Sequence, residues 1–176
     1  SNTLIGANIS TAISSPSLVG DSNRRAHIVW AITDIEILYI LLDPSLDDLD
    51  GDAGETANMT LASHIVADGS GIRNDPDIAI DSHDGAHVVW VDTYDPQGLY
   101  FGTPLIYYTM LTYDSSGNFN VEINNSIITP ALGYKGNPAV SIGTNNTVIV
   151  VWEDTRGSLI EYVGLLGTSG SMSTEW

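Results

Sequence analysis

Polar and apolar positions repeat three times along the chain. Each copy starts with a proline, runs through a short apolar segment to a polar turn, and reaches a tryptophan 14 residues after the proline. The prolines are Pro16, Pro76 and Pro138, and the tryptophans are Trp30, Trp90 and Trp152. The tryptophans are 60 and then 62 residues apart. This period predicts a protein built from three copies of one structural unit.

Each copy predicts strands and almost no helix. The run His87-Val-Val-Trp90 is apolar without alternation, which is typical of a strand buried on both faces. A tyrosine-rich run after each tryptophan predicts a further strand. The predicted first strands are 18–20, 78–80 and 140–142, and the tyrosine-rich strands are 37–42, 106–111 and 160–166. A weaker fourth strand precedes each proline, at 3–9, 59–66 and 121–129.

Four antiparallel strands in a repeat of about 60 residues are typical of a β-propeller blade. We therefore expect an all-β fold of three propeller blades. The alternative is another stacked all-β repeat, such as a β-solenoid or a tandem sandwich. Solenoid coils are usually shorter than this repeat and lack a doubly buried tryptophan strand.

The second repeat carries a resemblance to a known class of propeller. Its segments Pro76-Asp-Ile-Ala-Ile-Asp81, Gly85-Ala-His-Val-Val-Trp90 and Ile106-Tyr-Tyr-Thr-Met-Leu111 resemble blades of exported bacterial and archaeal propellers of the broad sialidase-like type. The resemblance implies an extracellular or cell-surface location. The Asp-box of sialidases, Ser-x-Asp-x-Gly and an aromatic residue, is not matched, since Asp81-Ser-His-Asp-Gly85 has another spacing. The resemblance therefore implies the blade and not sialidase activity.

Three blades are fewer than the four to eight of closed propellers. We expect one propeller unit over 1–176, with blades at about 10–66, 67–129 and 130–176. The strand 3–9 would complete another blade. Two chains would then form a homodimer with a six-bladed ring, in which 3–9 of each chain pairs with 159–166 of the other. The alternative is that the sequence is a piece of a longer propeller.

The net charge of the chain limits which classes of partner it can bind. Five basic and 22 acidic residues give a net charge of −17. Nucleic acid and anionic membrane are excluded as partners, because both need clustered Lys and Arg. There is no cysteine, which excludes disulfides and thiol catalysis. Apolar residues make up 43% of the chain, enough for a packed core.

An acidic segment is the candidate metal site. Asp48, Asp50 and Asp52 alternate, and Glu55 follows close by. Carboxylate oxygens in such a loop suit Ca²⁺, which prefers hard oxygen ligands. The segment resembles calcium loops of the dockerin and EF-hand type, but Gly51 is one residue early and Met59 occupies the place of the last glutamate. The alternative is a solvated acidic loop without metal.

The loops after the tryptophan strands supply the candidate ligand-binding residues. They are Asp92, Tyr94, Asp154 and Arg156. In a propeller these loops and those before each proline lie on one face around the axis. The alternative is that the two aspartates only cap turns by accepting backbone N–H bonds. We interpret His27 and His87 as structural and the three repeated tryptophans as core.

The prediction for function is a non-catalytic propeller module for binding or assembly, with a carbohydrate or peptide ligand and no catalytic residue. The alternative is a hydrolase of the sialidase-like or another glycoside-processing type. Such a hydrolase needs paired carboxylates on the axial face. The four arginines are spread along the chain, so the arginine cluster of sialidases is hard to build. The similarity of the three repeats also argues against one asymmetric catalytic centre.

Overall fold

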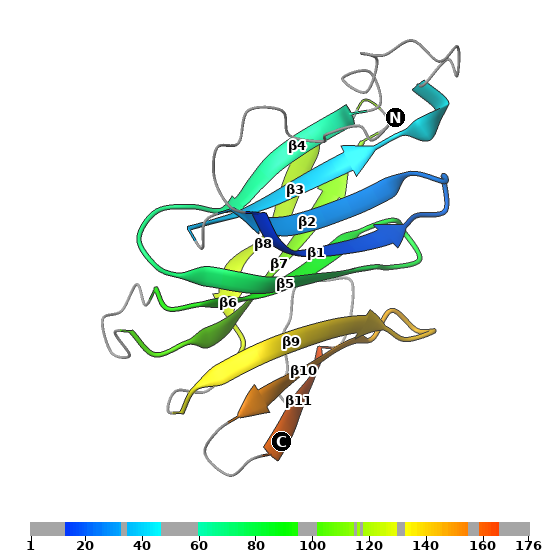
Figure 1. Ribbon diagram of the computed structural model, residues 1–176. Helices are drawn as coiled ribbons and strands as arrows, with labels where there is room; N and C mark the ends of the chain where they lie inside the picture. Colours follow the sequence, from blue (N-terminus) through cyan, green and yellow to red (C-terminus); the bar gives the residue numbers. More distant parts are fainter. Residues whose placement is uncertain are drawn as a thin grey trace.

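The computed structural model describes residues 13–32, 35–46, 60–94, 102–114, 116, 118–129, 133–154 and, as backbone, 159–165 (Figure 1). Within these residues all sheets are antiparallel, and one short 3₁₀ helix, η1 (Pro44–Leu46), follows the third strand. No helix in the described part of the chain is long and apolar enough to cross a membrane.

The strands form three separate sheets, which we name blades 1 to 3. Blade 1 contains β1 (Ile13–Gly20), β2 (Ala26–Ile32), β3 (Glu36–Leu42) and β4 (Thr60–Ala67). Blade 2 contains β5 (Arg73–Ile80), β6 (Ala86–Asp92), β7 (Leu105–Tyr113) and β8 (Phe119–Ile127). The described part of blade 3 contains β9 (Lys135–Ile142), β10 (Val148–Asp154) and β11 (Leu159–Leu165).

The three blades follow one another face to face (Figure 1). The first strand of each blade lies beside the first strand of the next, so β1 contacts β5 and β5 contacts β9. Within each blade the strands are in sequence order, from β1 to β4 and from β5 to β8. This is the arrangement of propeller blades, with β1, β5 and β9 nearest the axis. The predicted all-β propeller fold is confirmed.

The first strand of each blade is longer than the predicted segment, because it runs through the proline. A register shift interrupts the pairing between Ser14 and Ser17 of β1 and between Asn74 and Asp77 of β5. Proline has no N–H to donate to the ladder, and a bulge removes the need for one. The residue before each proline is left-handed, with φ of 51° at Ser15, 49° at Asp75 and 48° at Asn137.

The core lies between neighbouring blades. All residues of β6 are buried, which confirms the prediction of a strand covered on both faces. Trp90 packs with Val29 and Ala31 of blade 1, and Trp152 packs with Val89 and Val91 of blade 2. The three repeated tryptophans are 0–4% exposed, so their assignment to the core is confirmed.

An aspartate, a histidine and a tyrosine fix the turn between the first two strands of blade 2. Oδ1 of Asp81 accepts the N–H groups of His83 and Gly85 at 2.8 and 2.9 Å. Its Oδ2 lies 3.2 Å from Nε2 of His87, whose Nδ1 lies 2.7 Å from the hydroxyl of Tyr108. Since a carboxylate only accepts, Nε2 of His87 carries the proton and Tyr108 donates to Nδ1.

Blade 1 repeats this arrangement with Asp21, His27 and Tyr39. Nε2 of His27 lies 3.2 Å from Oδ2 of Asp21, and Nδ1 lies 2.7 Å from the Tyr39 hydroxyl. The predicted structural role of both histidines is therefore confirmed. Burial raises the pKa of Asp21, but hydrogen bonds from Arg25, Tyr113 and His27 outweigh it and leave the pKa at about 2.

These buried histidines should make the fold sensitive to mild acid. Burial lowers the pKa of His27 and of His87 below the ordinary 6.5, despite the neighbouring aspartates. In the unfolded chain both histidines take up a proton near pH 6.5, whereas in the folded chain they do so only at lower pH. Protonation thus favours unfolding, and the stabilisation is full above pH 6.5 and falls below it. Urea unfolding at pH 7.5, 6.5 and 5.5 should give a decreasing free energy of unfolding, and equal values would contradict this account.

Candidate functional site

The bulges of the three inner strands line a shallow depression that is open to solvent beside the axis, and we name it the axial pocket. Its volume is about 410 Å³. Its lining consists of Ser15, Pro16, Ser17, Asp75, Pro76, Asp77, Asn137, Pro138 and Ala139. The three left-handed residues are among them, one from each blade. Each bulge thus places one polar residue beside the axis at an equivalent point.

Asp77 ties the three blades together at this pocket. Its Oδ1 accepts the hydroxyl of Ser17 on β1 at 2.6 Å. Its Oδ2 accepts the N–H of Val140 on β9 at 2.8 Å. Both carboxylate oxygens are therefore held by neighbouring blades, and the side chain fixes the spacing of the inner strands.

Asp75 is held less tightly. Its Oδ1 accepts the hydroxyl of Ser15 at 3.2 Å, in an exposed setting. Within the described residues its Oδ2 has no hydrogen-bond partner. Asp75 is thus the carboxylate in the axial pocket that is available to a ligand. A left-handed backbone at a residue other than glycine is a strained conformation, and such positions cluster at functional sites.

A buried ion pair holds the loops above the axial pocket. Arg73 begins β5, and its Nε lies 2.7 Å from Oδ2 of Asp92, the last residue of β6. Both side chains are 3% exposed. The guanidinium also donates to the carbonyls of Ile35 at 2.7 Å and Gly69 at 3.2 Å. The pair therefore joins the loop of blade 1 to the loop that enters blade 2.

The loop around this pair is closely packed. Oδ1 of Asp92 accepts the N–H of Tyr94 at 2.7 Å. Gly71 has a φ of 134°, and a Cβ there would lie 2.5 Å from Asp92 Oδ1 and 2.8 Å from Tyr94 Cβ. Burial raises the pKa of Asp92, against the lowering effect of the Tyr94 N–H and Arg73. The buried charge thus depends on its partners.

Blade 3 has the same kind of pair. The ammonium of Lys135, the first residue of β9, contacts the carboxylate of Asp154, the last residue of β10. Both side chains are almost completely buried. The equivalent position of blade 1 is Ile32, which has no charge. Lysine and arginine therefore serve the same structural position in blades 3 and 2.

The structure places the predicted ligand-binding residues differently from one another. Asp92 and Asp154 are buried in the ion pairs, whereas Tyr94 is 44% exposed. Arg156 lies outside the described residues. The predicted calcium ligands Asp48, Asp50, Asp52 and Glu55 also lie outside them. Within the described part of the chain, no cluster of three or more metal-binding side chains is present.

The ligand-binding residues predicted from the sequence do not include Asp75, Asp77, Ser15 or Asn137. A signal was present, because the residue before each repeated proline is polar and differs among the repeats. This signal can be interpreted only once the bulge is known, because the bulge places that residue beside the axis. Without the bulge the segment before the proline looks like a plain loop.

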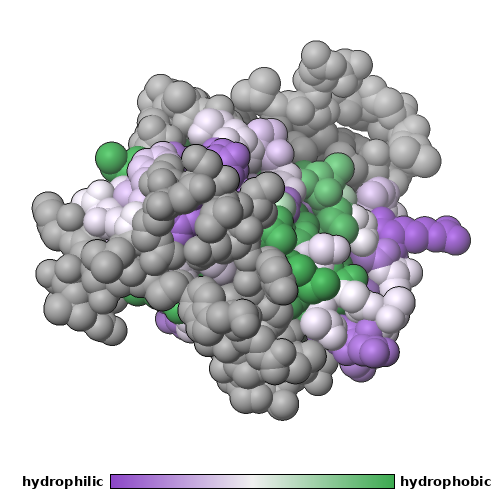
Figure 2. Space-filling view, turned by 90° about the horizontal axis from the view of Figure 1, so that it is seen from below, coloured by the Kyte–Doolittle hydropathy of each residue, from purple (hydrophilic) through white to green (hydrophobic). Residues whose placement is uncertain are grey.

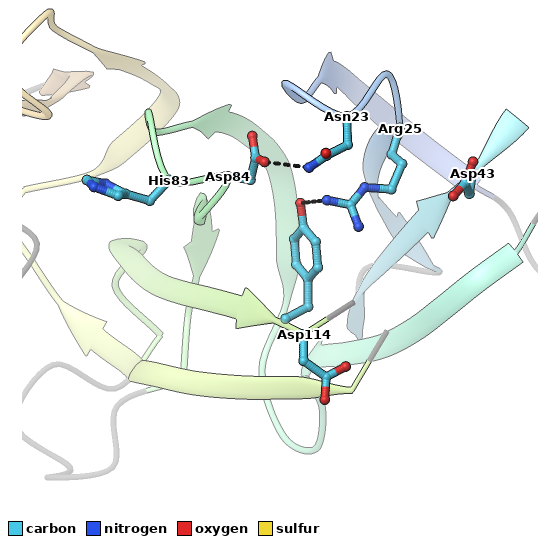
Figure 3. A pocket seen from close by; sticks show the side chains of 7 residues that line it. Asn23, Arg25, Asp43, His83, Asp84 and Asp114 are labelled. Atoms are coloured by element: carbon cyan, nitrogen blue, oxygen red, sulfur yellow. Dashed lines mark hydrogen bonds between the residues drawn. The ribbon is translucent and has the colours of Figure 1, made fainter. Parts of the chain in front are cut away.

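A second pocket of about 490 Å³ lies at the turns of the opposite ends of the strands (Figure 3). The Asp84 carboxylate accepts the N–H of Ser22 at 2.9 Å and the amide of Asn23 at 2.7 Å. The Arg25 guanidinium binds Asp21 at 2.7 Å and the Tyr113 hydroxyl at 3.1 Å. These polar groups form hydrogen bonds with one another and link blade 1 to blade 2. We therefore interpret this pocket as part of the interface between the two blades.

Comparison with known proteins gives structural matches and no sequence matches. No protein-family model matches the sequence, and no curated protein matches it. The endo-arabinase from Bacteroides thetaiotaomicron VPI-5482 has a similar structure, with a TM-score of 0.50 and 11% identity over 88% of this chain and 55% of that one. The Cellvibrio cellulosa alpha-L-arabinanase complexed with arabinohexaose has a TM-score of 0.51 and 12% identity, over 91% of this chain and 56% of that one.

Both similar structures are five-bladed β-propellers. This chain spans little more than half of their length. At this identity the likeness shows the fold. It supports propeller blades, while the sialidase-like type and the count of six blades are not confirmed.

These matches contradict the prediction of a non-catalytic module and the prediction that the chain is not an enzyme. Both similar structures are glycoside hydrolases, which favours the hydrolase alternative. The error has a physical origin. The similarity of the repeats was taken as evidence against an asymmetric centre, but the repeats differ at the axis, where equivalent positions carry Ser15, Asp75 and Asn137.

Proposed function

We propose that the chain is part of a glycoside hydrolase that acts on neutral glycans, with the axial pocket as its site. The observation that carries the proposal is Asp75, a carboxylate held beside the axis by a left-handed bulge. The similarity to an endo-arabinase and an alpha-L-arabinanase supports this reaction class. Arabinose-containing oligosaccharides are therefore the first substrates to test.

Hydrolysis of a glycosidic bond uses two carboxyl groups, one on each side of the bond. We assign to Asp75 the role of the carboxylate that activates water or attacks the sugar. Asp77 is a positioning residue, since both of its oxygens are bound by Ser17 and Val140. Among the described residues no third carboxylate lines the axial pocket. The general acid is therefore assigned to a part of the complete propeller beyond these residues.

The charges around the pocket favour a neutral substrate. The side chains that line it are hydroxyl, amide, carboxylate and apolar groups. The nearby cations Arg73 and Lys135 are buried against Asp92 and Asp154. They are thus engaged and do not offer a site for a sugar carboxylate. This argues for neutral sugars and against the sialidase-like reading of the blades.

Three further predictions from the sequence, on the ligand-binding loops, the acidic segment and the location, are part of this proposal. Asp92 and Asp154 would shape the loops above the pocket, and Tyr94 and Arg156 would contact the glycan there. The acidic segment with Asp48, Asp50, Asp52 and Glu55 would bind Ca²⁺ and stabilise the fold. An extracellular location suits an enzyme that acts on a polymer.

The proposal is tested by incubating the protein with neutral and acidic glycans. Arabinan, arabino-oligosaccharides, galactan and xylan form the neutral set, and sialyl-lactose and polygalacturonate form the acidic set. We expect release of reducing ends from a member of the neutral set and none from the acidic set. Hydrolysis confined to the acidic set, or absent from both, would contradict the proposal.

A further inference from the structure

An exposed tyrosine lies at the entrance to blade 3, next to the axial pocket. Tyr134 is the residue before β9 and is 55% exposed. Its ring folds back over Gly136, because a Cβ added to Gly136 would lie 3.2 Å from Cε1 of Tyr134. Gly136 is buried, and the following residue, Asn137, lines the axial pocket. The ring is therefore held beside the pocket while the residue stays accessible to a ligand.

The glycine at this point makes room for the ring. Counted from the repeated prolines, Ser14 and Asn74 occupy the position of Gly136 in blades 1 and 2. A side chain at this position of blade 3 would compete with the ring for the same space, because even a Cβ would crowd Cε1 of Tyr134. Among the three inner strands, β9 is thus the one whose backbone at this position is open to an aromatic ring.

The exposure of this position is a property of the blade, since it recurs where both neighbouring blades are described. The equivalent of Tyr134 in blade 2 is Ile72, which is 56% exposed although blade 2 packs between blades 1 and 3. The N–H of Ile72 donates to the Thr93 hydroxyl at 2.8 Å, and its carbonyl accepts the Thr93 N–H at 3.1 Å. The backbone is thus fixed while the side chain reaches solvent. The residue before an inner strand is therefore placed to contact a ligand.

Exposure alone does not identify a binding residue, because much of the surface of any folded protein is apolar. Figure 2 shows, from below, apolar and hydrophilic residues side by side on one face of the molecule. Tyr134 differs from an ordinary exposed apolar residue because it is aromatic and adjoins the axial pocket. The face of an aromatic ring carries partial negative charge, which attracts the weakly positive C–H groups of a sugar.

We propose that Tyr134 is a stacking platform for the sugar unit that adjoins the one bound at Asp75. This inference rests on the proposed function, because it takes the axial pocket as a glycan site. The polar side chains of the pocket would bind hydroxyl groups, and the Tyr134 ring would cover the apolar face of the next sugar. Since the ring contacts a sugar and not the bond that is cleaved, it contributes to binding and should affect KM rather than kcat.

The experiment measures binding separately from hydrolysis. The full chain and its variants Tyr134→Ala and Tyr134→Phe are titrated by calorimetry with hexasaccharides of arabinose, xylose and galactose. Binding is measured in the Asp75→Asn background, where the glycan is not consumed, and repeated without that substitution. Tyr134→Ala should weaken the binding of at least one hexasaccharide about tenfold, as expected for the loss of an aromatic contact. Tyr134→Phe keeps the ring and should retain the affinity.

The control is Val121→Ala, which shortens an exposed apolar side chain on β8, the outermost strand of blade 2. It should leave the affinity unchanged, and circular dichroism should show that all variants are folded. The inference is overturned if no hexasaccharide binds, if Tyr134→Ala binds as tightly as the natural sequence, or if Tyr134→Phe loses as much affinity as Tyr134→Ala.

The same measurements separate this inference from the proposed function. Binding that depends on Tyr134, without release of reducing ends from any glycan, would support the platform and contradict the hydrolase. Hydrolysis by Tyr134→Ala with unchanged KM and affinity would support the hydrolase and contradict the platform.

Discussion

Replacement of Asp75 by Asn is expected to lower kcat for a neutral glycan by about 10²- to 10⁴-fold, the usual contribution of a positioned acid or base. Asn keeps the size and the left-handed backbone, because Asn137 has a φ of 48° at the equivalent position of blade 3. The variant should therefore fold normally and still bind oligosaccharide. Initial rates of reducing-end release, with substrate affinity measured by calorimetry, separate the two effects.

The matched control is Asp68→Asn, in the exposed loop between β4 and β5. It removes the same charge without touching the axial pocket, so its kcat should equal that of the natural sequence. A variant Asp75→Asn with undiminished kcat would show that the reaction does not use this carboxylate. Loss of affinity with unchanged kcat would assign Asp75 to binding alone.

Replacement of Arg73 by Met is expected to destabilise the fold by about 3 to 5 kcal/mol, the usual cost of breaking a buried ion pair from one side. It leaves the Asp92 carboxylate buried at 2% exposure without its cation, and it also removes the bonds to the Ile35 and Gly69 carbonyls. Urea unfolding followed by tryptophan fluorescence measures the loss as a change in midpoint at constant slope.

The double variant Arg73→Met/Asp92→Leu distinguishes the ion pair from simple packing. Because it removes both charges, it should be more stable than Arg73→Met alone. If Arg73→Met lowered the free energy of unfolding by less than about 1 kcal/mol, the buried charge would not be the cause. The same would follow if the loss in the double variant equalled the sum of the losses in Arg73→Met and Asp92→Leu measured separately.

The fold could be predicted from the sequence where the hydrophobic pattern and the turn residues both indicated the same strands. The run from His87 to Trp90 has no polar alternation, and β6 is buried throughout. The first strands were predicted too short because proline was read as a strand boundary. In the structure each first strand continues through its proline by means of a bulge. A bulge depends on the pairing of two strands, so it cannot be predicted from the hydrophobic pattern of one strand alone.

Only part of the candidate site could be predicted from the sequence. Tandem repeats predicted which loops lie on one face, and Arg73 of one loop does contact Ile35 of another. The burial of Asp92 and Asp154 could not be predicted, because it depends on a cation 19 residues away in each blade. The axial pocket was missed because it arises where three blades meet. No single repeat contains it.

The left-handed residue before each inner proline has a consequence for how such a chain can change. The backbone at this point is the same in all three blades, while the side chain is serine, aspartate or asparagine. The conformation is therefore kept by the bulge and does not depend on one residue type. A single substitution such as Asn137→Asp would add a carboxylate at the equivalent point of another blade without a change of fold, and a second substitution at Asp75 would complete its transfer. The polar group beside the axis can thus change from blade to blade by mutation, at positions whose backbone already accommodates three residue types.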